Sequence, residues 1–311
     1  MTTELELRLT PNTPRRPTAL TIGVFDGVHL GHQALAGATV DEARQRGWRA
    51  LALTFWPHPR SVVGRGADVQ HLTTLPERRA LLRRRGVQGV ATLHFTPEVA
   101  SLRAEEFMRQ LKERLDVVSV WVGSDFALGR GREGTASVLG EIGRRTGFTV
   151  QTVSPVTLDG TVVSSSAVRT ALQTGDLQQA NQMLGRAYAF QGEVVPGDRR
   201  GRTLGFPTAN VALPKQLVVP ANGVYVVAAR LGCERFFGVA NVGTRPSFGT
   251  HEENLEVYLL DFSGDLYGRR LRVEFLRRLR AEERFDSVEG LVAQMQRDVA
   301  AARAFLAATP V

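Results

Sequence analysis

The first half of the chain alternates short apolar runs with longer segments of mixed polarity. The runs typical of strands lie at 19–25, 50–55, 88–95, 117–122 and 148–153, and the helix-like segments lie at 32–46, 76–85, 104–115 and 136–146. Such alternation is typical of βαβ units, in which helices cover both faces of a parallel sheet. The pattern predicts an α/β domain with a Rossmann-like parallel sheet.

The pattern changes after a helix-like segment at 176–185. The later runs are short and separated by turns rich in Gly, Pro and Asn, and they lie at 189–195, 223–230, 236–242, 254–262 and 270–276. This spacing predicts an antiparallel β-barrel or sandwich. A last helix is expected over 287–306, with Asp286 as its N-cap and Glu289 three residues on. We place the domain boundary near residue 186, which gives domains 1–186 and 187–311.

Composition narrows the class of protein. The 311 residues are 43% hydrophobic and 23% charged, as in a soluble globular protein. The single cysteine, Cys233, excludes an internal disulfide and fits a reducing compartment. The polar N-terminus has no apolar signal segment, and no apolar run approaches the roughly 18 residues of a membrane span. We therefore expect a cytoplasmic protein with no membrane partner.

The formal net charge is +8, and Lys112 and Lys215 are the only lysines, so the positive charge is nearly all arginine. This excess suits an anionic partner such as a nucleotide phosphate. The densest cluster, "ERRALLRRRG" at 77–86, is interpreted as the solvated face of a helix. Because the charge is otherwise dispersed and no aromatic RNA-binding signature is present, we expect no nucleic-acid partner. The alternative, a basic nucleic-acid-binding protein, predicts salt-sensitive oligonucleotide binding that does not need the histidines discussed next.

"GVFDGVHLGH" at 23–32 lies at the end of the first strand and opens the first helix. Ligands of open parallel sheets bind beyond the carboxyl ends of the strands, and a helix N-terminus favours phosphate. Glycines allow close approach of the backbone. His29 and His32, three apart on the first turn, could stabilise charge on one phosphate chain. A glycine-rich turn with two surface histidines remains the alternative.

Three further segments follow later elements of the same half. "TFWPHPR" at 54–60 carries His58, "VGSDFALGRGREG" at 122–134 carries Asp125 and Arg132, and "VSSSAVR" at 163–169 carries Ser164, Ser165, Ser166 and Arg169. Asp125 is placed to meet a base or ribose and Arg132 a phosphate, while the serines could either cap a helix or, with Arg169, clamp a triphosphate. "GRGREG" matches a dinucleotide fingerprint only formally, because it does not join the first strand to the first helix.

The second half contains its own candidate site. "GDRRGRTLGFPTAN" at 197–210 ends in Thr208 and Asn210, whose oxygen atoms point the same way from an extended segment and suit Mg²⁺. A β-turn with a polar exit is the alternative. In "NLEVYLLDFSGDLYG" at 254–268, Glu256 is either a general base or an exposed strand residue.

The four segments of the first half, in this order, resemble the FMN adenylyltransferase module of the prokaryotic bifunctional riboflavin kinase/FAD synthetase family. The resemblance implies that ATP and FMN give FAD and pyrophosphate. It implies that His29 and His32 bind the phosphates and take part in catalysis, and that Ser165 and Arg169 close over them. The residues expected to contact ATP or phosphate are Gly23, Phe25, Asp26, His29, His32, Asp125, Arg132, Ser164, Ser165 and Arg169.

The second half resembles the riboflavin kinase module of the same family through "GRTLGFPTAN", "ANGVYVV", "GVANVGTRPSFG", "LEVYLLDF" and "FLRRLRAEERFDSVEGL". The resemblance implies an antiparallel barrel with a terminal helix, Mg²⁺–ATP held by Thr208 and Asn210, and Glu256 as the base for the riboflavin 5′-hydroxyl. The residues expected to bind ATP or flavin are Gly197, Arg202, Gly205, Pro207, Thr208, Asn210, Asn241 and Arg277. Two positions depart from the family, which often has His at Tyr258 and Thr at Ser247.

The sequence thus predicts an enzyme that makes FMN from riboflavin and then FAD from FMN, with ATP and Mg²⁺. One alternative is a chain with a single active module. The presence of the expected residues of both modules argues against it. Another is a different nucleotidylyltransferase, against which the attached barrel argues. Oligomeric state, relative rates and transfer of FMN between modules stay open.

Overall fold

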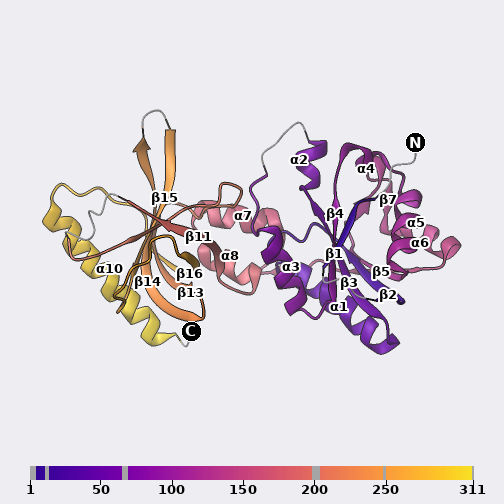
Figure 1. The fold of residues 1–311 in the computed structure, drawn as a ribbon, viewed down its shortest axis with the longest axis horizontal. Coiled ribbons are helices and arrows are strands. Elements are labelled where there is room, and N and C mark those ends of the chain that lie inside the picture. Colours follow the sequence, from indigo (N-terminus) through magenta and orange to yellow (C-terminus); the bar gives the residue numbers. More distant parts are fainter. Residues whose placement is uncertain (1–4, 11–13, 65–68, 198–203, 248–249, 310–311) are drawn as a thin grey trace. The chain divides into compact units, whose positions relative to one another are not determined.

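The computed structural model describes residues 5–10, 14–64, 69–197, 204–247 and 250–309 (Figure 1). The chain divides into two compact units, Met1–Ser165 and Ser166–Val311.

A six-stranded sheet forms the centre of the first unit. Its strands, in the order β1-β4-β3-β2-β5-β8, are β1 (Leu7–Thr10), β4 (Gly89–His94), β3 (Arg49–Trp56), β2 (Thr18–Ile22), β5 (Val117–Gly123) and β8 (Thr149–Val153). All pairs are parallel except β1 with β4. The predicted parallel sheet is therefore confirmed for five strands. Edge strand β1 was not predicted, because four residues give too little alternation to recognise.

Helices cover both faces of this sheet, because its central strands are apolar on both sides. On one face α1 (Leu30–Arg46) and α3 (Leu75–Arg84) pack through Leu35, Ala36 and Leu82 against Ala52 and Val90. On the other face α5 (Ala104–Leu115) and α6 (Ala136–Thr146) contribute to a larger core with the remaining strand residues. The short elements of the unit are α2 (Pro59–Val63), α4 (Pro97–Ser101), β6 (Ala127–Leu128), a 3₁₀ turn (Arg130–Arg132), β7 (Gly134–Thr135), β9 (Thr157–Leu158) and β10 (Thr161–Val162).

The strand order creates a switch point beside β2. The chain proceeds from β2 through β3 to β4 on one side, and β5 and β8 lie on the other side. The loops that follow β2 and β5 therefore diverge at the carboxyl ends of two neighbouring strands, which is where open α/β sheets bind ligands. Residues 23–29 and 124–134 occupy these two loops.

A closed six-stranded barrel forms the second unit (Figure 1). Its strands, in the order β11-β12-β15-β14-β13-β16, are β11 (Tyr188–Val195), β12 (Ala209–Val211), β15 (Thr250–Leu259), β14 (Glu234–Ser247), β13 (Gly223–Leu231) and β16 (Arg270–Arg280). The neighbouring strands of the barrel pair antiparallel throughout the described residues. The predicted barrel is confirmed. Helices α7 (Ser165–Thr174) and α8 (Leu177–Leu184) precede the first of these strands along the chain.

The terminal helix α10 (Val288–Ala308) packs on the outside of the barrel, against β14 and β16. Its predicted extent is close to the observed one, but the predicted N-cap Asp286 is wrong. Ser287 is the N-cap, because it has extended backbone angles and its hydroxyl accepts a hydrogen bond from the Gly290 amide at 3.1 Å. The buried residues of the helix are Asp298 and Ala302, so a charged residue lies at the centre of the contact face.

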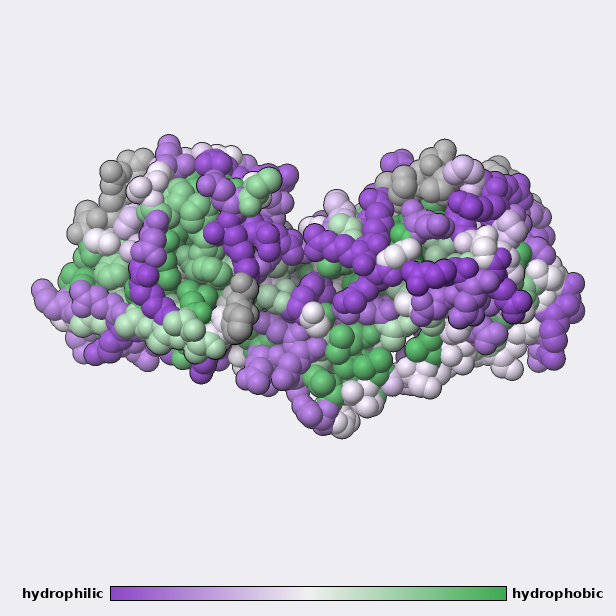
Figure 2. Space-filling view, turned by 90° about the horizontal axis from the view of Figure 1, so that it is seen from below, coloured by the Kyte–Doolittle hydropathy of each residue, from purple (hydrophilic) through white to green (hydrophobic). Residues whose placement is uncertain are grey.

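The surface of each unit mixes hydrophobic and hydrophilic residues. In the view of Figure 2, hydrophobic areas on the barrel and on the first unit are bordered by hydrophilic residues. The large hydrophobic side chains that are clearly exposed among the described residues are Val63, Val162, Tyr267 and Val288, and they are scattered along the chain. Within the described part, no helix combines the length and apolar character that crossing a membrane requires.

Candidate active sites

The loop between β2 and α1 has an unusual backbone. Phe25, Gly27 and Val28 have positive φ angles of 55°, 80° and 43°. Residues other than glycine rarely adopt such angles, which cost of order 1–3 kcal/mol each unless surrounding contacts hold them. At Gly23 a Cβ would lie 3.1 Å from the Phe25 ring, so the absence of a side chain lets the ring pack over the backbone. The loop therefore needs strong contacts to keep its conformation.

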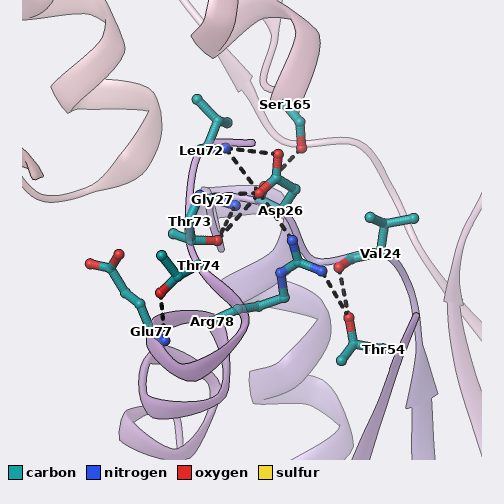
Figure 3. Close-up of polar contacts among 10 residues, drawn as sticks. All are labelled: Val24, Asp26, Gly27, Thr54, Leu72, Thr73, Thr74, Glu77, Arg78 and Ser165. Atoms are coloured by element: carbon teal, nitrogen blue, oxygen red, sulfur yellow. Dashed lines mark hydrogen bonds and ion pairs between the residues drawn. The ribbon is translucent and has the colours of Figure 1, made fainter. Parts of the chain in front are cut away.

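The carboxylate of Asp26 supplies these contacts (Figure 3). It is 1% exposed and accepts hydrogen bonds from the amides of Leu72 at 3.0 Å and Thr73 at 3.2 Å. It also accepts from the Thr73 hydroxyl at 3.3 Å and pairs with Arg78 at 3.2 Å. The Thr73 hydroxyl in turn accepts a hydrogen bond from the Gly27 amide at 3.2 Å. One buried carboxylate thus joins the loop after β2 to residues 72–73 and to α3.

Arg78 corrects the interpretation of the arginine cluster at 77–86. Its side chain is fully buried, and besides Asp26 its guanidinium donates to the Thr54 hydroxyl at 3.3 Å. Thr54 donates to the Val24 carbonyl at 2.8 Å. The solvated-face interpretation holds for Arg83 and Arg84, which are exposed. It is wrong for Arg78, because the Arg78 side chain points to the carboxyl end of the sheet and pairs there with the Asp26 carboxylate.

The two histidines lie together at the beginning of α1. His29 is the N-cap, and its Nδ1 accepts the His32 amide at 3.4 Å. The two rings are stacked, with centroids 3.6 Å apart and planes 20° apart, and Phe25 meets the His32 ring edge-on at 5.2 Å. The Nδ1 of His32 is buried and has no hydrogen-bond partner among the described residues.

Burial lowers the pKa of His32 well below its ordinary value of 6.5, and the neighbouring His29 and Arg78 lower it further. Protonated His32 would place a second positive charge near Arg78 with little solvent to stabilise it. The predicted pairing of two histidines at one helix start is confirmed by the geometry. Their contact with phosphate stays a prediction.

The segment before α7 also reaches this loop. The Ser165 hydroxyl donates to the Asp26 carbonyl at 2.8 Å, so the predicted serine lies next to the histidine loop (Figure 3). Ser164 is half-buried beside it. His58 caps α2 by accepting the Arg60 amide at 3.0 Å, and its ring lies 5.8 Å from that of His71. Arg169 lies on α7 in the second unit, so its place over the phosphates stays a prediction.

Asp125 and Arg132 follow the neighbouring strand β5. Both side chains are exposed, and an Arg132 guanidinium nitrogen donates to the Asp125 backbone carbonyl at 3.2 Å. The Asp125 carboxylate lies over Gly123, where a Cβ would come within 3.1 Å of it. Asp125 and Arg132 therefore contact each other in the loop after β5, where we expect the nucleotide to bind.

The second candidate site is a row of polar residues on the outside of the barrel. Asn210 on β12 pairs with Glu256 on β15, which pairs with Asn241 on β14. Directly paired residues point to the same side of a sheet. Leu255 and Val257 are fully buried and alternate with half-buried Glu256, so the Glu256 side chain lies on the outer face of its strand, and Asn210 beside it is 8% exposed.

Glu256 is held by neighbouring hydrogen bonds. One carboxylate oxygen accepts the Thr208 hydroxyl at 3.3 Å and the other accepts the Asn254 amide nitrogen at 2.9 Å. Gly197 lies so close to the Asn210 amide that a Cβ at residue 197 would overlap it. The hydroxyl of Thr208, the amide oxygen of Asn210 and a carboxylate are the hard donors that Mg²⁺ prefers, so these residues fit the ion.

The other predicted kinase residues have varied surroundings. Gly205 has a φ of 83° and is exposed, as is Pro207. Arg277 is exposed and its guanidinium lies 5.5 Å from the centroid of the Phe305 ring on α10. Tyr258 meets Phe206 edge-on at 5.3 Å. Arg202 and the side chain of Ser247 lie outside the described residues.

Sequence reasoning missed four residues that hold the two sites: Thr54, Thr73, Arg78 and Asn254. The hydroxyls and the arginine have no spacing relation to the histidine motif, because they reach it from different elements of the fold. Asn254 is two residues before Glu256 and on the same strand face, so strand alternation could have found it.

Comparison with known proteins identifies the family of each half of the chain. A family model for FAD synthetase matches residues 12–167, and one for riboflavin kinase matches residues 184–306. The bifunctional riboflavin kinase/FMN adenylyltransferase of Escherichia coli K12 is 41% identical over 95% of each chain. The proteins of that name from Pseudomonas fluorescens and Bacillus subtilis are 42% and 36% identical, over 94% and 90% of each chain.

The chain belongs to the bifunctional riboflavin kinase/FMN adenylyltransferase family. A crystal structure from Streptococcus pneumoniae, titled as a macrolide-efflux protein, shares the fold with a TM-score of 0.88 and 32% identity. The matched region covers 94% of the present chain and 95% of the Streptococcus pneumoniae chain. The family match divides the chain into the same two parts that carry the histidine loop and the Glu256 row.

Proposed function

We propose that the second unit transfers the γ-phosphate of ATP to riboflavin, giving FMN, and that the first unit transfers AMP from ATP to FMN, giving FAD and pyrophosphate. The observation that carries this proposal is the presence, on one chain of the family, of both the histidine loop at the β2–α1 junction and the Glu256 row on the barrel. The substrates are riboflavin, FMN and ATP. We also propose a cytoplasmic enzyme without nucleic-acid or membrane partners, with functional domains divided near residue 186, although the compact units of the fold meet at Ser165 and Ser166.

The adenylyl transfer needs positioning and charge stabilisation. An oxygen of the FMN phosphate attacks the α-phosphorus of ATP, and the bond to the β-phosphate oxygen breaks to release pyrophosphate. The free amides at the amino end of α1 carry partial positive charge and suit the phosphates. His29 and His32, at the same helix start, would donate hydrogen bonds as charge develops. The exposed pair Asp125 and Arg132 would meet the nucleotide from the adjoining loop.

The kinase step needs a base and a metal. Glu256 would accept the proton of the riboflavin 5′-hydroxyl while that oxygen attacks the γ-phosphorus and ADP leaves. Thr208 and Asn210 would hold Mg²⁺, which offsets the negative charge of the phosphates when bound. The hydrogen bonds from Thr208 and Asn254 fix the Glu256 carboxylate on the outer face of the strand.

The test is a chromatographic time course with purified protein, riboflavin, ATP and Mg²⁺. FMN should appear first and FAD later. The double variant His29→Ala/His32→Ala should lose FAD formation and keep FMN formation, whereas Glu256→Ala should lose FMN formation and still convert supplied FMN to FAD. Equal loss of both products in either variant would contradict the two-site assignment.

Removal of divalent ions by a chelator tests whether FMN formation requires a metal. EDTA in excess over Mg²⁺ should stop FMN formation, and added Mg²⁺ should restore it. If FMN forms at the same rate without free divalent ion, Thr208 and Asn210 do not act through a metal.

A further inference from the structure

The buried guanidinium of Arg78 joins the ends of two strands at the adenylyl site. One nitrogen contacts the Asp26 carboxylate at 3.2 Å in the loop after β2, and another donates to Thr54 of β3 at 3.3 Å (Figure 3). Both side chains of the ion pair are essentially unexposed. A planar guanidinium presents separate nitrogen donors to two partners at fixed angles, whereas an ammonium group is a single point charge on a flexible stem. Arg78 thus fixes the separation of the loop and the strand.

The Asp26 carboxylate depends on this partner. A buried carboxylate without an opposite charge is costly, and removal of one member of such a pair leaves the other uncompensated. Asp26 also receives the amides of Leu72 and Thr73, so its position controls two neighbouring segments. The positive φ angles of Phe25 and Val28 in the same loop are sustained only while these contacts hold.

The loop so held ends at His29, the N-cap of α1, and its Asp26 carbonyl receives the Ser165 hydroxyl. We propose that Arg78 is a positioning residue for FAD formation: through the Asp26 carboxylate it holds residues 23–29, and with them His29 and the amino end of α1, in the geometry that receives the phosphates of ATP. This inference rests on the proposed function of the first unit. Arg78 does not itself touch the phosphates in this role.

The experiment compares three substitutions in the full-length protein. Arg78→Met removes both the charge and the guanidinium donors, and Arg78→Lys keeps a positive charge for Asp26 but loses the planar arrangement of donors that joins Asp26 to Thr54. Arg84→Met is the matched control, because Arg84 lies on the same helix and is exposed. For each variant, kcat and KM are measured for FAD formation from FMN and for FMN formation from riboflavin, at a temperature well below the onset of unfolding.

We expect Arg78→Met to lower kcat for FAD formation at least ~10-fold, since a misplacement of about 1 Å can cost ~100-fold. KM for ATP should change less than kcat, because the loss concerns the geometry of the reacting state. Arg78→Lys should give an intermediate kcat, and FMN formation should be unchanged. Arg84→Met should match the unsubstituted protein in both reactions.

An unchanged kcat for FAD formation in Arg78→Met, with only a lower melting temperature, would overturn the proposal and leave Arg78 a structural residue. If Arg78→Met does not fold, Arg78→Lys decides, because it keeps a positive charge beside Asp26 but loses the planar guanidinium. A several-fold fall in its kcat supports the proposal, and an unchanged kcat contradicts it. If the unsubstituted protein makes FMN but no FAD, the proposed function of the first unit fails before the variants are compared.

Discussion

His29 and His32 cannot both carry a positive charge at low cost, because their stacked rings are 3.6 Å apart. Burial, His29 and Arg78 all lower the pKa of His32, so this ring is neutral at physiological pH. A neutral ring can offer a hydrogen bond to phosphate without adding repulsion beside Arg78. The proposed phosphate contact therefore requires a histidine at position 32 and also requires that its ring be neutral.

The low pKa of His32 has a consequence for stability. The unfolded chain, where the pKa is near 6.5, binds more protons than the folded chain at pH values between the two pKa values. The free energy of unfolding of the first unit should therefore fall as the pH drops below about 7, and should fall less in His32→Gln. Trp48, Trp56 and Trp121 are the only tryptophans and all lie in the first unit, so tryptophan fluorescence during denaturant unfolding reports on it. Parallel pH dependences in the two proteins would contradict the assignment.

At the scale of elements, helix α10 is held to the barrel by charge as well as by apolar contact. The Arg280 guanidinium on β16 donates to Asp298 at 2.8 and 3.0 Å, and this hydrogen bond raises the pKa of Arg280. The side chains of Arg280 and Asp298 are 17% and 8% exposed. Gln294 also donates to Asp298 at 2.9 Å. The ion pair therefore fixes the helix at one point of the barrel wall.

Loss of this pair should loosen the helix. Asp298→Ala should lower the free energy of unfolding of the barrel by about 2 kcal/mol, less than the ~3–5 kcal/mol of fully buried pairs, because Arg280 keeps some contact with water. Thermal unfolding followed by circular dichroism measures the change. The control is Arg303→Ala on the same helix, which removes the exposed ion pair with Asp261 and should leave the melting temperature unchanged. Equal effects of the two substitutions would show that burial of the pair is unimportant.

For the whole molecule, the connection between the two units is itself structured. Within the second unit, the Asn181 side chain on α8 donates to the Phe275 carbonyl at 2.9 Å and accepts the Tyr188 amide at 2.7 Å. The Ala221 amide donates to the Leu172 carbonyl of α7 at 2.9 Å. Helices α7 and α8 thus pack with the barrel, although α7 begins in the serine segment expected to serve the adenylyl site.

These contacts predict different stabilities for two fragments. Residues 166–311 should melt at a higher temperature than residues 187–311, because only the longer fragment keeps the Asn181 and Leu172 contacts. Both should phosphorylate riboflavin if the barrel folds alone. Calorimetric melting and FMN formation by each fragment are the measurements. Equal melting temperatures would favour a functional boundary at residue 186 and assign the two helices to the first domain.

The sequence by itself determined the alternating α/β half, the barrel half and the positions of His29, His32 and Glu256, because periodicity and motif order are local properties that survive without a structure.

Only the tertiary structure decided which residues hold these sites. Arg78 was read as part of a solvated helix face, and its burial against Asp26 depends on the packing of α3 over the strand ends, across a separation of 52 residues. Thr54 and Thr73 reach the same loop from other segments, and Ser287 replaced Asp286 as the N-cap of α10. Such contacts depend on where elements meet in space, and hydrophobic periodicity carries no information on which polar side chain will find which partner there.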